Sequence, residues 1–335
     1  MVTLNGSFLI RSQLKRVIVA SIVVSVLVYF GVVLFIDKNV TKPIAEVNRD
    51  RLLHLREACE RTNNAGSTSC WKHVLQTKLH CISLLLPFFV EYTIETSFYI
   101  HVKNESLLYC LVFKSGTTTW FYNINRWAGY SEETILDDKT DNFMLARQKY
   151  PWENPRVLLT SMKNTYSFIV VRDPFERLIS AYEERLLGQL HPYFTSLSHH
   201  IYKRYHDDGN EYGIPSFQDF ARYVVDEARS EQPSDLHWRP INDLCTPCLA
   251  RYDSIIKMET FGQDLAYLAN RTQLQDKIKT VHMNHSRRDP LIRLIEKYFS
   301  QLTKQQYEDL YEVYRIDFEL FQYSPDKYLK FIKQT

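Results

Sequence analysis

The sequence has few glycines, little excess charge and no low-complexity tract. It contains 9 glycines among 335 residues, and 41 basic against 39 acidic side chains leave a formal net charge of +2. These features exclude fibrous and disordered proteins, which depend on biased composition or high net charge. A dedicated nucleic-acid-binding protein is usually more basic, so we expect no nucleic-acid partner. The hydrophobic content of 45% suffices for a sizeable core, and the length fits one large domain with an appendage.

One long hydrophobic run, VIVASIVVSVLVYFGVVLFI, occupies residues 17–36 without a charged residue. About 20 apolar residues are enough for a helix to cross a bilayer. The run ends at Asp37 without the small residues of a signal-peptidase site, so it predicts an uncleaved transmembrane signal-anchor. A buried core helix is the alternative, but a run of Val and Ile without polar spacing does not suit one.

The flanks of this run indicate its orientation. Arg11, Lys15 and Arg16 precede it without an acidic residue, whereas the following charges are mixed. By the positive-inside rule, this favours a cytosolic N-terminus and a single-pass type II topology. Four Asn-x-Ser/Thr sequons beyond the run agree with a lumenal location, at Asn39, Asn104, Asn270 and Asn284. We expect a cytosolic tail (1–16), a membrane span in the lipid bilayer (17–36), a stem with helical pieces (37–80) and a lumenal domain (81–335).

The six cysteines all follow the hydrophobic run, at Cys59, Cys70, Cys81, Cys110, Cys245 and Cys248. In an oxidising lumen an even number indicates disulfides, whose connectivity the sequence does not give. The Cys245-Thr-Pro-Cys248 pair has a zinc or redox alternative, but zinc needs a second ligand pair and none is evident. We expect Cys110, Cys245 and Cys248 to be structural, at least one of the latter two to form a disulfide, and no metal site.

Two segments share a strand–loop–helix layout. The apolar run 106–113 is followed by the loop KSGTTT and a segment that can be helical. The run 167–171 is followed by RDPF and an amphipathic segment, with Pro174 suited to the first turn of a helix. Repeated units of this kind predict a parallel α/β sheet, whose ligands bind at the carboxyl ends of the strands. The run CISLLLPFFV at 81–90 predicts a further buried element or strand, and the last third is rich in predicted helices.

The first loop has the chemistry of an anion site. A loop that leads into a helix N-terminus presents backbone N–H groups and a positive dipole to an anion. Lys114 adds a point charge, and Gly116 lets the backbone approach closely. This is not a Walker A loop, which places lysine after its second glycine, and an ordinary capped turn is the alternative. We expect a phosphate or sulfate site formed by Lys114, Ser115, Gly116, Thr117, Thr118 and Thr119.

The second loop also begins with a cation. Arg172 follows the second predicted strand and can hold a phosphate at the helix start. Ser180 lies about two helical turns further on and can face the same side. Arg185 is the next basic residue within reach, with Arg177 as an alternative. A surface helix with Arg–Glu pairs, which would involve Glu176, Glu183 and Glu184, is the competing interpretation.

These segments carry a family resemblance. Residues 114–120, KSGTTTW, resemble the loop that binds the 5′-phosphosulfate of 3′-phosphoadenosine 5′-phosphosulfate (PAPS) in sulfotransferases, with Phe113 where proline is usual. RDPFERLISAY from Arg172 resembles the 3′-phosphate segment of Golgi carbohydrate sulfotransferases. The resemblance implies a P-loop-like parallel-sheet sulfotransferase fold flanked by helices, with PAPS as co-substrate and no metal. It also implies that Arg172 and Ser180 bind the 3′-phosphate and that Lys114 stabilises the leaving group.

A third segment narrows the resemblance to one branch. Residues 235–260, DLHWRPINDLCTPCLARYDSIIKMET, resemble a block of the chondroitin 4-O, dermatan and HNK-1 sulfotransferase group. His237 is a candidate base because its unperturbed pKa lies near neutrality, with substrate binding or a structural role as alternatives. Trp238 could stack on a sugar or pack in the core, and Arg239 could hold an acidic acceptor. Acidic residues between the two PAPS segments are alternative bases: Glu132, Glu133, Asp137, Asp138 and Asp141.

These observations predict a Golgi membrane enzyme that transfers a sulfuryl group from PAPS to a hydroxyl of a glycan or proteoglycan, chondroitin-type acceptors included. Catalysis would rest on positioning and charge stabilisation, as in phosphoryl transfer. A nucleotide kinase would need Walker spacing, which the sequence lacks. A non-catalytic glycan-binding protein on the same fold is the other alternative, and the presence of Lys114, Arg172 and Ser180 argues against it.

Overall fold

The computed structural model describes residues 42–74, 94–188, 191–230, 234–280 and 290–333. The chain divides into two units, Met1–Glu46 and Val47–Thr335, and the second contains the sheet and the site. Within the described ranges no helix is long and apolar enough to cross a membrane. The predicted span at 17–36, the sequons at Asn39 and Asn284 and the apolar run at 81–90 lie outside the described residues.

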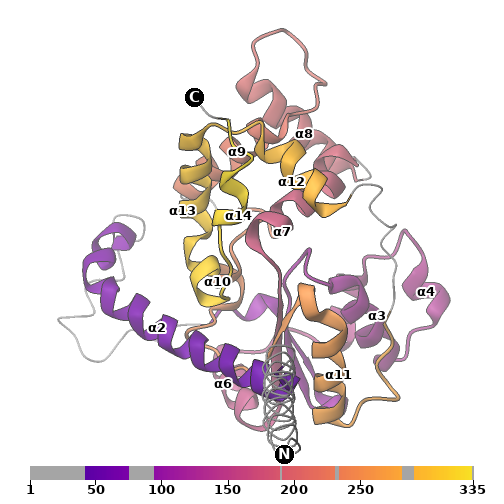
Figure 1. The fold of residues 1–335 in the computed structure, drawn as a ribbon. Coiled ribbons are helices and arrows are strands. Elements are labelled where there is room, and N and C mark those ends of the chain that lie inside the picture. The colour runs from indigo at the N-terminus through magenta and orange to yellow at the C-terminus, as the bar shows by residue number, and fades with distance from the viewer. Residues whose placement is uncertain (1–41, 75–93, 189–190, 231–233, 281–289, 334–335) are drawn as a thin grey trace, which may run out of the picture. The chain divides into compact units, whose positions relative to one another are not determined.

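A four-stranded sheet forms the centre of the second unit, in the order β1 (Tyr99–Val102), β2 (Leu107–Cys110), β3 (Tyr166–Val171), β4 (Ser254–Lys257) (Figure 1). β2, β3 and β4 are parallel, and β1 pairs antiparallel with β2 at the edge. The predicted parallel pairing of the two apolar runs is therefore confirmed. Neither β1 nor β4 was predicted from the sequence.

Burial explains why the two predicted strands read as continuous apolar runs. Every residue of β2 is buried, and so is every residue of β3 after Tyr166. Parallel strands covered on both faces have no polar alternation. The helices that follow them begin with recognisable signals: α3 (Thr117–Trp127) follows Gly116, and α7 (Pro174–Ala181) is capped by Asp173, which accepts from two backbone N–H groups.

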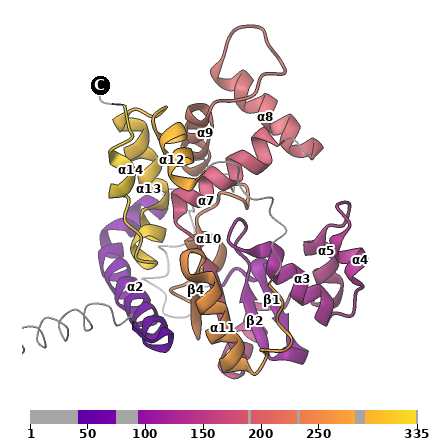
Figure 2. The same cartoon turned by 45° about the vertical axis from the view of Figure 1, so that its right-hand side comes forward.

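The remaining helices fall into two groups (Figure 2). Around the sheet lie α4 (Glu132–Leu136), α5 (Asn142–Lys149), α6 (Pro155–Asn164), α10 (Ile241–Cys245) and α11 (Phe261–Thr272). A second hydrophobic core joins α7 to α8 (Pro192–Tyr205), α9 (Phe217–Arg229), α12 (Leu291–Phe299), α13 (Lys304–Leu320) and α14 (Asp326–Leu329). Phe175 of α7 is fully buried within this core, so the helix that carries the second motif is held by the C-terminal helices.

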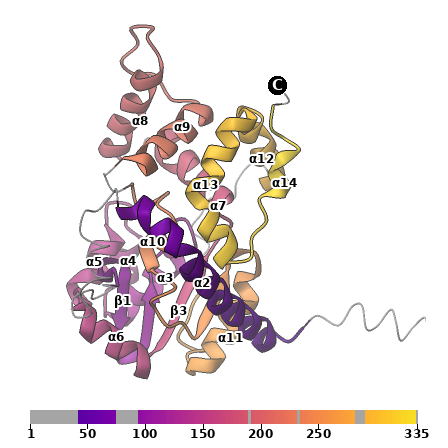
Figure 3. The ribbon, with the colours of Figure 1, turned by 90° about the vertical axis from the view of Figure 1, so that its left-hand side faces the viewer.

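The predicted stem contains α2 (Ile44–Val74), whose first half packs beside the sheet and α11 (Figure 3). Arg51 donates to the backbone O of Ile255 in β4 at 2.8 Å and to Asp264 Oδ2 at 2.7 Å. A disulfide also joins Cys59 of α2 to Cys248, with Cα atoms 5.4 Å apart. The helical pieces were predicted from the sequence, but their packing on the sheet was not.

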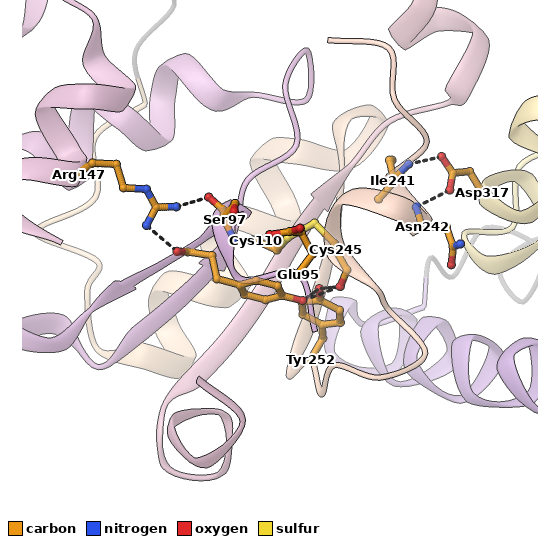
Figure 4. The surroundings of a disulfide bond; sticks show 10 residues. Glu95, Ser97, Cys110, Arg147, Ile241, Asn242, Cys245, Tyr252 and Asp317 are labelled. Atoms are coloured by element: carbon orange, nitrogen blue, oxygen red, sulfur yellow. Dashed lines mark hydrogen bonds between the residues drawn. A yellow bond between two sulfur atoms is a disulfide. The ribbon is translucent and has the colours of Figure 1, made fainter. Parts of the chain in front are cut away.

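A second disulfide joins Cys110 at the end of β2 to Cys245, with Cα atoms 6.0 Å apart (Figure 4). The expected disulfide role of the Cys245–Cys248 pair is confirmed, since each sulfur bonds a distant partner. This pairing is incompatible with the redox and zinc alternatives. Cys70 and Cys81 lie outside the residues whose side chains the structure describes.

Hydrogen bonds fix the surroundings of this disulfide. Tyr99 and Tyr252 both donate to the backbone O of Cys245, at 2.6 and 2.9 Å. The buried carboxylate of Asp317 accepts from the backbone N of Ile241 at 2.6 Å and of Asn242 at 2.8 Å, so α13 holds the start of α10. The strand that leads into the first motif is therefore joined to the third segment by the Cys110–Cys245 disulfide, and the neighbouring strand β1 by the hydrogen bond from Tyr99.

Candidate active site at the ends of the parallel strands

A cavity of about 1110 Å³ opens where β2 and β3 end. Both motif loops contribute to its wall, as does the third segment, so the structure brings together side chains from three distant stretches of sequence. Most of the predicted site residues line it: Lys114, Gly116, Thr117, Thr118, Thr119, Arg172, Ser180, Arg185 and His237. Ser115 is not among the lining residues, and its side chain is fully buried.

The first loop places a helix N-terminus at the cavity. Gly116 immediately precedes α3 and has a left-handed backbone, with φ of 73°. A Cβ atom there would lie 3.2 Å from both Met258 Sδ and Phe261 Cε2. Glycine therefore satisfies both the backbone conformation and the tight packing. The first-turn N–H groups of α3, with the hydroxyls of Thr117 and Thr118, are arranged to bind an anion.

Lys114 is the central cation of the cavity. Its side chain is 8% exposed, and its ammonium forms an ion pair with Glu184, from the turn that follows α7. Burial lowers the pKa of Lys114 to about 8, even though Glu184 acts in the opposite direction. Burial also raises the pKa of Glu184, but the nearby Lys114 outweighs it and holds that pKa below its ordinary value. Sequence reasoning treated Glu184 only as a surface ion-pair partner, so the structure adds it to the site.

The second motif supplies two further cations. Arg172 donates to the backbone O of Lys114 at 3.3 Å, which links the two loops directly, and lies 3.9 Å from Glu176. Ser180 reaches the cavity from the same helix, as its spacing predicted. Arg185 lies 3.3 Å from Glu184, and its guanidinium stacks over the Phe194 ring at 5.1 Å. The cluster of positive charge at a helix N-terminus suits a ligand with more than one anionic group.

A π-helical turn, Tyr182–Leu187, carries Glu184 and Arg185. Its wide ring is closed by the N–H of Gly188, which donates to the O of Glu183 at 3.1 Å. A Cβ at Gly188 would lie 2.5 Å from the backbone O of Glu184, so a larger residue cannot occupy this position without moving the turn. Such turns inside helices occur frequently at functional sites.

His237 also lines the cavity. Its Nδ1 lies 2.7 Å from Asp235 Oδ1, and its ring lies between Phe113 and Phe194, with centroids 4.7 and 5.2 Å away. Burial lowers the pKa of His237, and Asp235 only partly offsets this, so the neutral imidazole is favoured. The Nε2 atom is buried and makes no hydrogen bond within the described part of the chain.

Several other residues singled out from the sequence, Arg177, Trp238 and Arg239 among them, do not line the cavity. Arg177 is fully buried and donates only to backbone carbonyls. It therefore has a structural role and does not provide the phosphate contact considered as an alternative to Arg185. Trp238 packs in the core and donates to Glu227 at 2.6 Å. Arg239 donates to the backbone O of Ser234. Of the five candidate carboxylates, Asp138 and Asp141 line the cavity.

A third wall was missed in the sequence analysis. Residues 258–263, which follow β4, line the cavity together with Thr280. They follow the carboxyl end of a third parallel strand, as ligand-binding residues of such sheets do. The only signal in the sequence was the pair Ile255 and Ile256 at the centre of Ser254–Lys257, which is too short an apolar run to indicate a strand. Recognising β4 as a strand would have pointed to its end as part of the site.

The arrangement defines a class of protein: an α/β protein with a cavity, lined by Lys114, Arg172 and Arg185, at the ends of its parallel strands. Comparison with known proteins gives the family. A model of the sulfotransferase family matches residues 98–324, well over half of the chain. The chain belongs to this family, and it is a sulfotransferase.

Its similarity to individual relatives is distant but extensive. It is 27% identical to carbohydrate sulfotransferase 11 of Rattus norvegicus over 243 residues, which cover 68% of this chain and 67% of the relative. It is 29% identical to carbohydrate sulfotransferase 11 of Danio rerio over 246 residues, with the same coverage. It is 27% identical to carbohydrate sulfotransferase 8 of Homo sapiens over 232 residues, covering 66% of this chain and 54% of the relative. No solved structure matches.

Proposed function

We propose that this sulfotransferase uses PAPS to sulfate a hydroxyl of a glycan. The observation that carries the proposal is that Lys114 and Arg172 line one cavity at the N-terminus of α3, linked by a direct hydrogen bond. PAPS carries a 3′-phosphate and a 5′-phosphosulfate, and two separate cationic loops suit these two groups. The family membership agrees with this donor.

The glycan acceptor is inferred from the relatives, which are named carbohydrate sulfotransferases. The third segment, with its resemblance to the chondroitin 4-O, dermatan and HNK-1 group, supports the same class of acceptor. Chondroitin-type chains, free or on a proteoglycan, are therefore the first acceptors to test. Arg239 is not available to hold an acidic sugar in this arrangement, because its guanidinium is engaged with Ser234 away from the cavity.

The proposed reaction is an in-line displacement at sulfur. The acceptor oxygen forms a bond to sulfur while the bond from sulfur to the bridging oxygen breaks, and its electron pair stays on the departing nucleotide phosphate. Lys114 and the N–H groups at the start of α3 stabilise that developing charge. Arg172, Ser180 and Arg185 hold the phosphates. His237 is one of the candidate bases, identified from the sequence, that could take the proton of the acceptor hydroxyl.

We also propose that the enzyme is a type II Golgi membrane protein with its catalytic unit in the lumen. Two disulfides within the described residues fit an oxidising compartment. The sequon residues Asn104 and Asn270 are both exposed and so are accessible to modification. In secretory-pathway expression, glycosidase treatment should increase the electrophoretic mobility of the protein. Unmodified Asn104 and Asn270 together with reduced cysteines would contradict this location.

The donor is tested by titrating the purified protein with adenosine 3′,5′-bisphosphate, the nucleotide product, in a calorimeter. Saturable binding that ATP does not compete away supports PAPS use, and tight ATP binding instead would favour a kinase. A second step incubates the protein with radiolabelled PAPS and a panel of chondroitin, dermatan and HNK-1-type glycans. Nucleotide binding without transfer to any glycan or other hydroxyl acceptor would favour the non-catalytic alternative.

A further inference from the structure

The cavity contains a carboxylate that neither nucleotide-binding motif requires. Glu184 contacts the Lys114 ammonium on one side and lies 3.3 Å from Arg185 on the other. Its side chain is 44% exposed, whereas that of Lys114 is only 8% exposed. Glu184 is therefore the accessible end of a buried ion pair, at the point where the reacting groups of the donor are expected.

The local backbone is built to hold Glu184 in this place. The π-helical turn Tyr182–Leu187 replaces the ordinary helical ring just where Glu184 and Arg185 reach the cavity. Gly188 permits this turn, because a Cβ there would meet the backbone O of Glu184 at 2.5 Å. A regular amphipathic helix would contain no π-helical turn. We attribute the turn to the placement of Glu184 and Arg185 at the cavity.

The other candidates for proton acceptance are less suitable. His237 uses Nδ1 for Asp235, and its Nε2 is buried. Asp141 caps α5, accepting from the backbone N of Phe143 at 3.0 Å and of Met144 at 3.1 Å. Four acidic residues line the cavity: Asp138, Asp141, Glu184 and Glu259. Of these, Glu184 forms the ion pair with Lys114.

We propose that Glu184 is the base for the acceptor hydroxyl and that Lys114 holds it in place until the nucleotide binds. This rests on the proposed PAPS-dependent reaction. When PAPS enters, the Lys114 ammonium turns to the phosphosulfate and releases the carboxylate. The acceptor oxygen then bonds to sulfur, and the bond to the bridging oxygen breaks with its electrons retained by the nucleotide. The acceptor proton passes to Glu184 and from there to water.

Glu184 has two proposed roles, as the base for the acceptor hydroxyl and as the ion-pair partner of Lys114. Removing its charge should lower turnover but should not weaken nucleotide binding, so one substitution tests both. Glu184→Gln removes the base but also frees Lys114 from a competing anion. In single-turnover transfer from radiolabelled PAPS to the best glycan of the panel, we expect the rate to fall by about 100-fold or more. The Kd for adenosine 3′,5′-bisphosphate should stay the same or decrease. Glu308→Gln is the matched control, because Glu308 is an exposed carboxylate paired with a lysine, Lys304, outside the cavity lining, and it should keep both values.

Chemical rescue separates proton transfer from a structural role. Glu184→Ala should regain part of its turnover when formate is added, since a small carboxylate can occupy the vacated space, and Glu184→Asp should retain more turnover than Glu184→Gln. Glu184→Gln with wild-type turnover would overturn the proposal. So would a loss of turnover matched by an equal rise in Kd, without rescue by formate. If the wild-type protein neither binds the nucleotide nor transfers sulfate, the proposed function fails instead, which is a distinguishable result.

Discussion

The Arg177 side chain offers a quantitative test of how the active-site loops are supported. It is fully buried, and its guanidinium donates to the backbone O of Phe113 at 2.9 Å, of Arg239 at 2.8 Å and of Leu236 at 3.2 Å. Phe113 precedes Lys114 of the first motif, while Leu236 precedes His237 and Arg239 follows it by two residues. Arg177 thus joins the first loop to the third segment through buried hydrogen bonds.

The substitution Arg177→Met keeps an unbranched apolar stem similar to the aliphatic part of arginine but removes all of these donors. Each buried carbonyl left without its partner costs about 1–3 kcal/mol, and carbonyls retain other ways to be partly satisfied. We therefore expect a total loss of about 3–5 kcal/mol of unfolding free energy. For a domain of this size, that corresponds to a fall in Tm of roughly 10 °C.

The measurement is urea unfolding of the purified, oxidised protein, followed by intrinsic fluorescence. Arg204→Met is the matched control: Arg204 is 46% exposed and pairs with Asp226 at 2.9 Å on the surface. The control should lose less than about 1 kcal/mol, because exposed ion pairs contribute little. If Arg177→Met were no more destabilising than Arg204→Met, the structural assignment of Arg177 would be refuted.

Three further predictions concern the nucleotide. Arg172→Ala should weaken binding of adenosine 3′,5′-bisphosphate by about 1.5–3 kcal/mol, the usual value of a charge-assisted hydrogen bond; unchanged calorimetric affinity would remove Arg172 from the 3′-phosphate site. Burial lowers the pKa of Lys114 to about 8, so the cation is present below that pH and lost as pH rises through it. The rate of single-turnover sulfuryl transfer should therefore fall above about pH 8, because the charge of Lys114 acts mainly on the leaving group, and a Lys114→Arg variant that showed the same decline would contradict this cause. Lys327 lies 3.0 Å from Asp173 and 2.8 Å from Glu176, beside Arg172, so Lys327→Met should raise the nucleotide Kd about three- to tenfold by unmasking two negative charges. Lys327→Arg should restore it, and an unchanged Kd for Lys327→Met would exclude this charge-balancing role.

The elements that could be predicted from the sequence are those with strong local signals. β2 and β3 are continuous apolar runs because they are buried on both faces, and each is followed by a loop whose residues favour a helix start. Most of the predicted site residues line the cavity for the same reason: the carboxyl ends of neighbouring parallel strands meet at one edge.

What could not be predicted depends on contacts between distant residues. β1 and β4 lack the continuous apolar run that marked β2 and β3, because His101 interrupts β1 and the polar residues Ser254 and Lys257 begin and end β4. The docking of α2 rests on single side chains such as Arg51, and disulfide pairing is a property of the folded geometry. The ion pair between Lys114 and Glu184 joins residues 70 positions apart, and a π-helical turn has no distinctive composition. Glu184 therefore looked like any other charged residue on an amphipathic helix.

The most direct test of the central claim is single-turnover transfer of radiolabel from PAPS to a glycan, by the wild-type protein and by Lys114→Ala. We predict that the wild-type protein labels a glycan hydroxyl from the panel. Lys114→Ala should lose most of its turnover and keep much of its nucleotide affinity, because the Lys114 contact strengthens as the bond to the leaving group breaks. No transfer by the wild-type protein to any acceptor, or full turnover by Lys114→Ala, would contradict the account.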